Sequence, residues 1–157
     1  MEAVYLGADH AGFELKEKLK DYLHRKGYAV HDFGAFTYDK DDDYPDFAIP
    51  VAEMAVSKKG KGILVCGSAE GICIAANKVK GARAVAVWDK TSAKLSRSHN
   101  DANILCLAGG KTKQNVQGIG ISFSKAKELV DAWLKTPFSG EKRHVRRLLK
   151  LHHYEKA

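Results

Sequence analysis

Residues 62–78 read GILVCGSAEGICIAANK, which joins a short apolar run, a cysteine, a glycine-containing turn and a segment of helical period. The run 62–67 has the length and composition of a buried strand, and the apolar residues of 69–80 recur as in a helix. Such a turn exposes backbone N–H groups where the helix dipole favours negative charge. The stretch therefore predicts a strand–turn–helix unit of an α/β protein with a thiol at its turn.

The same alternation extends in both directions along the chain. Four further runs of apolar and β-branched residues predict strands at 3–8, 28–33, 82–88 and 103–109. Segments of helical period predict helices at 12–27, 45–58, 90–98, 124–135 and 140–156. Five strands separated by helices predict a doubly wound, Rossmann-like α/β fold, with a five-stranded parallel sheet, helices on both faces and a C-terminal helix. No linker or internal repeat interrupts residues 1–157, so we expect one domain.

Composition excludes several classes of protein. A hydrophobic share of 45% and a charged share of 29% over 157 residues are ordinary for a globular protein and exclude disordered and fibrous classes. No apolar stretch approaches the 18 or so residues of a membrane span, and the N-terminal residues do not resemble a signal peptide. The three cysteines are odd in number and lack CxxC spacing, which favours a reducing cytoplasm over a disulfide framework.

The net charge of +7 raises the possibility of a nucleic-acid partner. Acidic residues, however, concentrate in 39–46, and basic residues concentrate in 142–150, KRHVRRLLK. A basic C-terminal helix is more often a solvated face than a nucleic-acid reader, and a third interpretation is that it holds one small anion such as a phosphate monoester. We expect neither a nucleic-acid nor a membrane partner.

Ligands of doubly wound sheets bind beyond the carboxyl ends of the strands. Asp9 and His10 follow the first predicted strand, 66–71 follows the third, and 108–112 follows the fifth. A helix start beside Cys66 would lower its pKa and favour the thiolate. Asp9 and His10 suit acid–base work or anion binding. A buried structural cysteine and an exposed loop histidine remain alternatives, and Cys73 and Cys106 are expected to be core residues.

Two further groups lie late in the chain. In RSHNDAN (97–103), turn formation explains the asparagines, among them Asn100, but gives no reason for His99. In RHVRR, Arg143 and Arg147 are four residues apart on one helix face with His144 beside them, an arrangement that suits a phosphate or belongs to a solvated tail. No histidine spacing predicts a metal site, and no G-x-S-x-G elbow predicts a serine hydrolase.

Taken in order, these segments resemble the ribose-5-phosphate isomerase B family over essentially the whole chain. The segments are GADHAGFELKEKL (7–19), YPDFA (44–48), CGSAEGICIAANKVKGARA (66–84), RSHNDAN, and F-x-G followed by RHVRR. The resemblance implies a metal-independent aldose–ketose isomerase that needs no cofactor and acts on a sugar phosphate. It also implies a homodimer, often paired into tetramers, with active sites at the subunit interface.

The resemblance assigns roles residue by residue. Cys66 matches the base that moves the proton between C2 and C1 of ribose 5-phosphate. Ser68 and the backbone N–H groups of Gly67 to Gly71 would hold the enediolate oxygens. His99, from the neighbouring subunit, would open the sugar ring with Asp9 assisting at the hydroxyls. The residues expected to bind the rest of the substrate, the phosphate above all, are His10, Asn100, Arg143, His144, Arg147 and Lys111.

The chain departs from the family pattern at two places. Ala69 stands where the family turn usually has glycine, which makes a positive φ less accessible. Lys111, in the segment Gly109–Gly110–Lys111, stands one residue beyond the family's usual phosphate-binding arginine and would replace it as a point charge. The alternative functions are an isomerase of a six-carbon sugar phosphate, such as allose or galactose 6-phosphate, and a non-catalytic sugar-phosphate-binding module.

Overall fold

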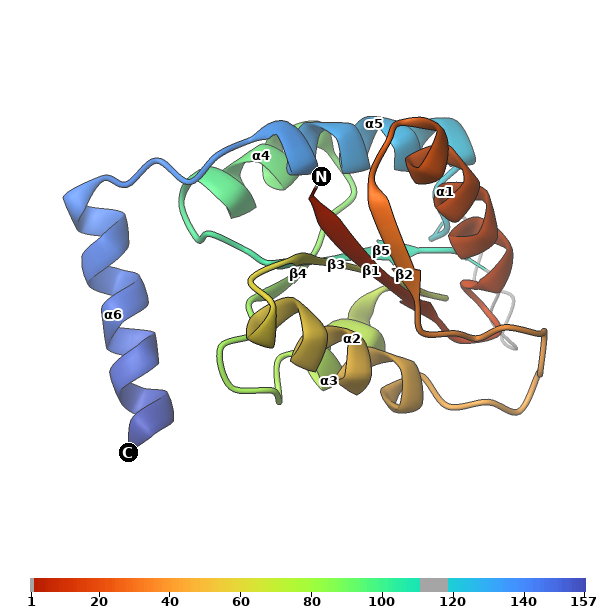
Figure 1. Cartoon of the computed structure of the whole chain (residues 1–157), viewed down its shortest axis with the longest axis horizontal. Coiled ribbons are helices and arrows are strands. Elements are labelled where there is room, and N and C mark those ends of the chain that lie inside the picture. The colour runs from red at the N-terminus through yellow and green to blue at the C-terminus, as the bar shows by residue number, and fades with distance from the viewer. Residues whose placement is uncertain (1, 111–118) are drawn as a thin grey trace.

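A computed structural model describes residues 2–110 and 119–157 and contains a single sheet in that part of the chain. Its five strands are all parallel and lie in the order β2-β1-β3-β5-β4 (Figure 1). They are β1 (Ala3–Ala8), β2 (Ala29–Asp32), β3 (Lys61–Cys66), β4 (Ala84–Ala86) and β5 (Ile104–Ala108). The doubly wound α/β fold is therefore confirmed.

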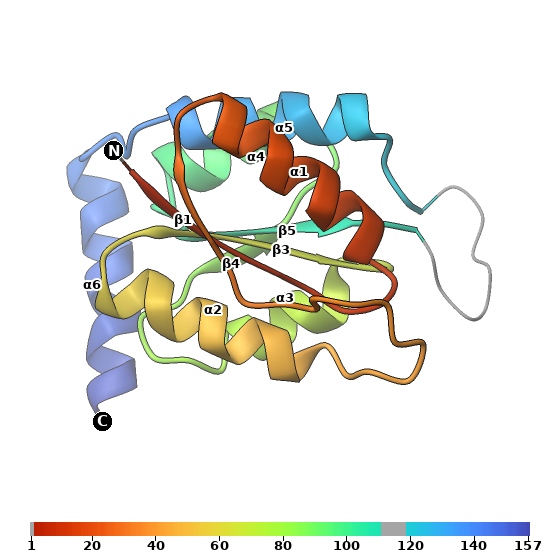
Figure 2. The ribbon, with the colours of Figure 1, turned by 45° about the vertical axis from the view of Figure 1, so that its right-hand side comes forward.

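Helices cover both faces of the sheet, as Figures 1 and 2 show. On one face lie α1 (Phe13–Arg25), α4 (Lys90–Ser98) and α5 (Phe123–Lys135), and on the other lie α2 (Pro45–Ser57) and α3 (Glu70–Ala76). Each layer has its own core, one around Trp133 and the other around Ile72. Because both faces are covered, the central strands are buried along nearly their whole length, which explains their continuous apolar sequences.

Two elements are shorter than the sequence predicts. The strand expected at 82–88 spans only Ala84–Ala86, and the helix expected at 69–80 ends at Ala76. The reason is Asn77, whose side chain accepts a hydrogen bond from the Ala84 N–H at 2.8 Å and donates one to the Ala84 carbonyl at 2.9 Å. The amide group of Asn77 thus ends α3 and ties it to the start of β4.

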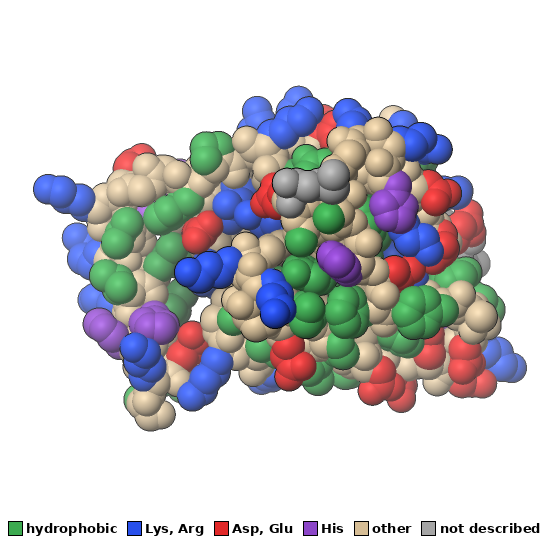
Figure 3. All heavy atoms as spheres, viewed as in Figure 1, with side chains coloured by type: hydrophobic (Ala, Val, Ile, Leu, Met, Phe, Trp, Pro, Cys, Tyr) green, Lys and Arg blue, Asp and Glu red, His purple; other side chains and the backbone are tan. Residues whose placement is uncertain are grey.

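The last helix, α6 (Lys142–Lys156), extends away from the rest of the fold (Figure 1). His144 is its only buried residue, whereas Val145, Leu149, Leu151 and Tyr154 are exposed. Figure 3 shows hydrophobic side chains along this helix among Lys, Arg and His side chains. Within the part of the chain that the structure describes, no helix has the length and apolar character needed to cross a bilayer.

A buried lysine connects α1 to the end of β2. The side chain of Lys16 is 0% exposed, and its Nζ lies 2.8 and 2.9 Å from the two carboxylate oxygens of Asp32. The same Nζ donates to the Ala35 carbonyl at 2.6 Å, just before the acidic loop begins. Burial alone would raise the pKa of Asp32, but the hydrogen bonds from Lys16 and Lys20 outweigh burial and lower this pKa. This network fixes where the loop after β2 leaves the sheet.

Candidate active site

The carboxyl edge of the sheet holds a pocket of about 700 Å³ at the point where the strand order reverses. From β1 the chain crosses to β2 on one side, and β3 lies on the other side, so the loops after β1 and β3 diverge and leave a crevice. Asp9 and His10 line it from the first loop, and Cys66, Gly67, Ser68 and Gly71 line it from the second. The structure thus brings together the predicted groups that follow these two strands.

The Cys66 thiol is buried at the end of β3, with the residue 4% exposed. Burial raises its pKa, the nearby Asp9 carboxylate raises it further, and backbone N–H groups of the turn, led by that of Ile72, oppose the shift without reversing it. The lowered pKa expected from the sequence is therefore wrong for this chain, because desolvation of the sulfur outweighs the field of the turn. The thiol rests protonated at neutral pH.

The turn after Cys66 keeps an uncommon backbone conformation despite its alanine. Ala69 has φ +67° and forms the N-cap of α3, so it adopts the left-handed region that the sequence made less accessible. This conformation costs a non-glycine residue on the order of 1–2 kcal/mol. Gly71 lies against Tyr44, which also lines the pocket: a Cβ there would lie 2.8 Å from its ring atoms, so the ring would have to shift.

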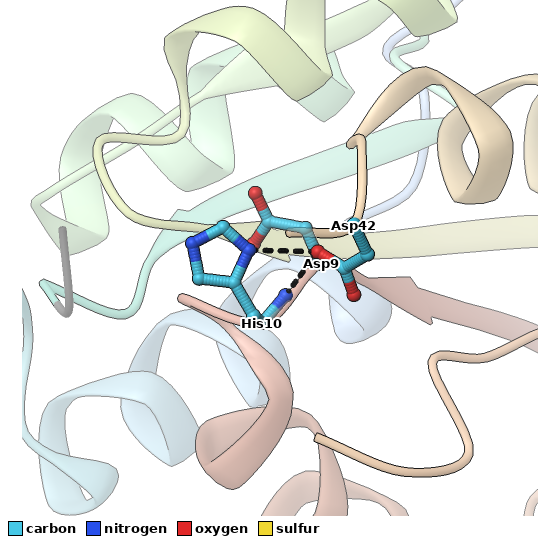
Figure 4. Close-up of side chains that lie close together, drawn as sticks. All are labelled: Asp9, His10 and Asp42. Carbon is cyan, nitrogen blue, oxygen red and sulfur yellow. Dashed lines mark hydrogen bonds and ion pairs between the residues drawn. The ribbon is translucent and has the colours of Figure 1, made fainter. Parts of the chain in front are cut away.

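Asp9, His10 and Asp42 lie close together in the pocket, and hydrogen bonds join His10 to Asp42 (Figure 4). Asp42 Oδ1 accepts from the backbone N–H of His10 at 2.9 Å and lies 2.7 Å from its ring Nδ1. Asp9 Oδ1 accepts from the backbone N–H groups of Ala11 and Gly12 at 3.0 and 3.2 Å. Burial raises the pKa of Asp9, and the Asp42 carboxylate adds to this. Asp42 therefore holds the His10 ring in place.

The same three residues have the donor types of a metal site. One ligand atom from each of Asp9, His10 and Asp42 lies within 4.8 Å of the others. The hydrogen bonds from His10 hold Asp42 close and already occupy Asp42 Oδ1 and His10 Nδ1, whereas Asp9 is held by the backbone N–H groups of Ala11 and Gly12. The arrangement is that of an oriented imidazole between two carboxylates.

The charges that line the pocket are mainly negative. Five carboxylates lie in its wall against one histidine and one lysine; these residues are Asp9, Asp41, Asp42, Asp43, Glu70, His10 and Lys40. Such a wall repels an anion and is poorly suited to hold a doubly charged phosphate by itself. It is well suited to the hydroxyl groups of a polar substrate.

The predicted residues of 97–103 and of α6 lie at the opposite, amino edge of the sheet. His99 is the C-cap of α4, which runs back from the carboxyl edge. Four residues later, the carbonyl of Asn103 accepts a hydrogen bond from the backbone N–H of Gly62 at the start of β3. The rings of His99 and His144 lie against each other with centroids 4.2 Å apart and planes tilted by 34°. Arg143 Nε lies 2.8 Å from a carboxylate oxygen of Glu141.

We call Asp9, His10, Cys66 and Ser68 the carboxyl-edge cluster, and His99, Asn100, Arg143, His144 and Arg147 the amino-edge cluster. The wall of the carboxyl-edge pocket contains no member of the amino-edge cluster. One chain therefore holds the predicted site residues in two separate clusters. Lys111 falls outside the described residues, and its role stays a prediction.

Sequence reasoning missed Asp42 and Tyr44 as pocket residues. Asp42 lies in the acidic run and Tyr44 lies in YPDFA, so both belong to stretches that the sequence analysis singled out. Neither residue directly follows a strand, and the rule for strand ends therefore did not select them. The side chain of Cys106 is buried in β5 as predicted, whereas Cys73 on α3 is only partly buried.

A doubly wound parallel sheet with a thiol, carboxylates and an oriented imidazole at its switch point defines an α/β protein suited to proton transfer on a small polar substrate. Residues 4–151 match the profile of the family described as Ribose/Galactose Isomerase. The chain therefore belongs to this family, which confirms the resemblance seen in the sequence.

Individual relatives cover nearly the whole chain. The ribose-5-phosphate isomerase B of Mycobacterium tuberculosis (strain CDC 1551) is 43% identical over 155 residues, which are 98% of this chain and 90% of the relative. A probable ribose-5-phosphate isomerase B of Mycoplasma genitalium is 40% identical over 98% of this chain and 95% of the relative.

Solved structures of such enzymes have the same fold. Ribose-5-phosphate isomerase B of Clostridium thermocellum superposes with a TM-score of 0.87 at 41% identity, covering 98% of this chain and 97% of the other. The Mycoplasma genitalium enzyme with bound ribulose-5-phosphate superposes with a TM-score of 0.89 at 38% identity, covering 98% and 96%.

Proposed function

We propose that the protein interconverts ribose 5-phosphate and ribulose 5-phosphate by aldose–ketose isomerisation. The observation that carries this proposal is the match, at a TM-score of 0.89 over 98% of the chain, to an isomerase that holds ribulose-5-phosphate. The carboxyl-edge pocket supports it, because it combines the groups that the reaction needs: a base, donors for an enediolate and contacts for sugar hydroxyls.

In the proposed mechanism Cys66, as thiolate, removes the C2 proton of the open-chain aldose. The electrons of the C–H bond form the C1–C2 double bond of an enediolate, and the carbonyl oxygen at C1 gains negative charge. Ser68 and the backbone N–H groups of 67–71 stabilise that charge, and Asp9 contacts the hydroxyls. The C2 hydroxyl proton moves to the C1 oxygen, and the thiol returns its proton to C1 as the C2 carbonyl forms. These steps give the ketose with no net gain or loss of electrons or protons.

We further propose that two copies of the chain complete each site, as a homodimer that could pair into a tetramer. The acidic carboxyl-edge pocket of one copy needs a partner for the phosphate, and the basic amino-edge cluster supplies it from the other copy. His99 of that copy opens the ring, while Arg143, His144 and Arg147 bind the phosphate. The exposed apolar side chains of α6 support a second copy as the covering surface.

Mixing two inactive variants tests the shared site. We expect Cys66→Ala and His99→Ala chains, unfolded together and refolded, to recover about one quarter of wild-type activity, because half of the dimers are mixed and each mixed dimer has one intact site. The measurement is ketose formation from ribose 5-phosphate.

The matched control for this mixing pairs Cys66→Ala with Ser68→Ala, whose altered residues belong to the same cluster. No mixed dimer of that pair contains an intact site, so this control should recover no activity. If neither mixture recovered activity, this result would contradict the shared site.

A six-carbon substrate is the second candidate, because the family description names galactose beside ribose. Parallel assays with ribose 5-phosphate, allose 6-phosphate and galactose 6-phosphate, all containing EDTA, decide between them. Binding of all three without turnover would leave a binding module. The three free cysteines support a reducing cytoplasm as the site of action.

A further inference from the structure

We propose that Ser139 is a positioning residue that fixes the tautomer of His144, so that the neutral ring presents its Nε2–H to the phosphate of the substrate. This inference rests on the proposed function, which assigns His144 to the phosphate. It adds a residue that the sequence comparison with the family did not single out.

Ser139 contacts His144 and the residue that precedes His99. Its backbone N–H donates to the carbonyl of Ser98 at 3.0 Å, directly before His99. Its Oγ lies 2.7 Å from His144 Nδ1 and accepts a hydrogen bond from the backbone N–H of Glu141 at 3.2 Å. One serine thus joins the end of α4 to the start of α6, where the two histidine rings lie against each other.

The hydrogen bonds at Ser139 favour one tautomer. If His144 Nδ1 carried the proton, the exposed Ser139 Oγ would accept two hydrogen bonds, and its own proton would have only solvent as an acceptor. If the hydroxyl donates to Nδ1, both hydrogen bonds of Oγ are made within the protein, and only Nε2–H is left for a ligand. The neutral ring then carries its proton on Nε2.

Nε2 of His144 is the atom left for a ligand. No hydrogen-bond partner of this atom lies within residues 2–110 and 119–157. It is not among the fully buried polar atoms that lack a partner there, so it keeps some contact with solvent. The residue is 2% exposed overall, so this atom lies at the small part of the ring that reaches solvent.

The tautomer matters because the ring is neutral in the working range. Burial lowers the pKa of His144, and the neighbouring His99, Arg143 and Arg147 lower it further, while Glu141 acts in the opposite direction. A neutral imidazole has one proton, so the other tautomer would turn a lone pair toward an anionic phosphate. Ser139 therefore decides whether the His144 ring attracts or repels the phosphate.

Imidazole nitrogen spectra of the full chain test the tautomer without substrate. In two-bond ¹H–¹⁵N correlation spectra, with the His144 signals assigned by their loss in His144→Gln, we expect the Nε2–H pattern for wild type. We expect a mixed or Nδ1–H pattern for Ser139→Ala. An Nδ1–H pattern in wild type would overturn the proposal even if the protein isomerises ribose 5-phosphate.

Kinetics test the consequence. We expect Ser139→Ala to raise KM for ribose 5-phosphate about tenfold, which corresponds to the loss of one hydrogen bond. The value of kcat should change less than about twofold. The KM ratio of variant to wild type should fall as pH drops below the pKa of His144, because the imidazolium carries both protons. Ser139→Thr, which keeps the hydroxyl, should restore KM.

Ser122→Ala is the control for a merely structural loss, because Ser122 caps α5 through the Lys125 N–H at 3.1 Å and lies in neither cluster. Its KM should equal that of wild type. A KM ratio for Ser139→Ala that is the same at every pH, or no rescue by threonine, would refute the positioning role. Absence of isomerase activity in wild type would instead refute the proposed function, and the spectra would still decide the tautomer.

Discussion

We expect replacing Cys66 by alanine to lower the turnover of ribose 5-phosphate by about 1,000-fold or more, while ribose 5-phosphate still binds. A positioned general base contributes on the order of 100- to 10,000-fold, and in the described part of the pocket Cys66 is the only thiol. The measurement is ketose formation by purified wild type and variant, side by side in the presence of EDTA.

The control for this substitution is Cys73→Ala, which removes a partly buried thiol from α3 seven residues later. It should keep most of the wild-type rate. Equal activity of Cys66→Ala and wild type would place the proton transfer on another residue. Binding by both proteins with turnover by neither would favour the binding-module alternative.

The raised pKa of Cys66 predicts how the wild-type rate depends on pH. Only the thiolate removes a proton, and burial keeps its fraction small at neutral pH. We therefore expect kcat/KM to increase with pH from neutral up to the raised pKa and to level off above it. A rate that is flat above pH 7 would contradict this assignment, because it would require a base that is already ionised there.

Substituting Lys16 by methionine destabilises the fold by about 3 kcal/mol and lowers Tm by roughly 6–12 °C. The change leaves the largely buried Asp32 carboxylate without the ammonium group that contacts both of its oxygens. Removing one partner of a buried ion pair typically costs about 3–5 kcal/mol, and the remaining contact with Lys20 at 2.9 Å favours the lower end. Thermal and denaturant unfolding at one protein concentration measure both quantities.

Lys20→Met provides the matched control for this change, since it removes the same charge from the more exposed partner of Asp32. Its cost should stay near 1 kcal/mol or below, as for other exposed pairs. In the double variant Lys16→Met, Asp32→Leu, much of the lost stability should return, because no charge is then left buried. A Lys16→Met loss no larger than that of Lys20→Met would show that the ion pair is energetically unimportant.

The sequence predicted the layered architecture because its strongest signals are those of the buried strands. β1, β3 and β5 are covered on both faces, so their apolar runs are continuous and short. β4 and the end of α3 were placed less well, since their limits depend on the hydrogen bonds between Asn77 and Ala84 rather than on local propensity.

The chemistry of the site was predicted in part. The rule for strand ends found Asp9, His10 and Cys66, but the direction of the Cys66 pKa shift was wrong because burial is a tertiary property. Asp42 was missed for a similar reason, since the loop carrying it returns to the sheet only in the folded chain. The position of His99 was foreseeable, because a residue just before a parallel strand lies at the amino edge.

The position of the two clusters on opposite edges of one sheet also bears on how such a chain diverges after gene duplication. Suppose that one copy has lost only its carboxyl-edge cluster and the other only its amino-edge cluster. With sites shared as proposed, a mixed pair of these copies still has one working site. Each copy then becomes dependent on the other, although neither has changed its fold. With sites shared in this way, selection would act on the pair of edges that meet rather than on the single chain.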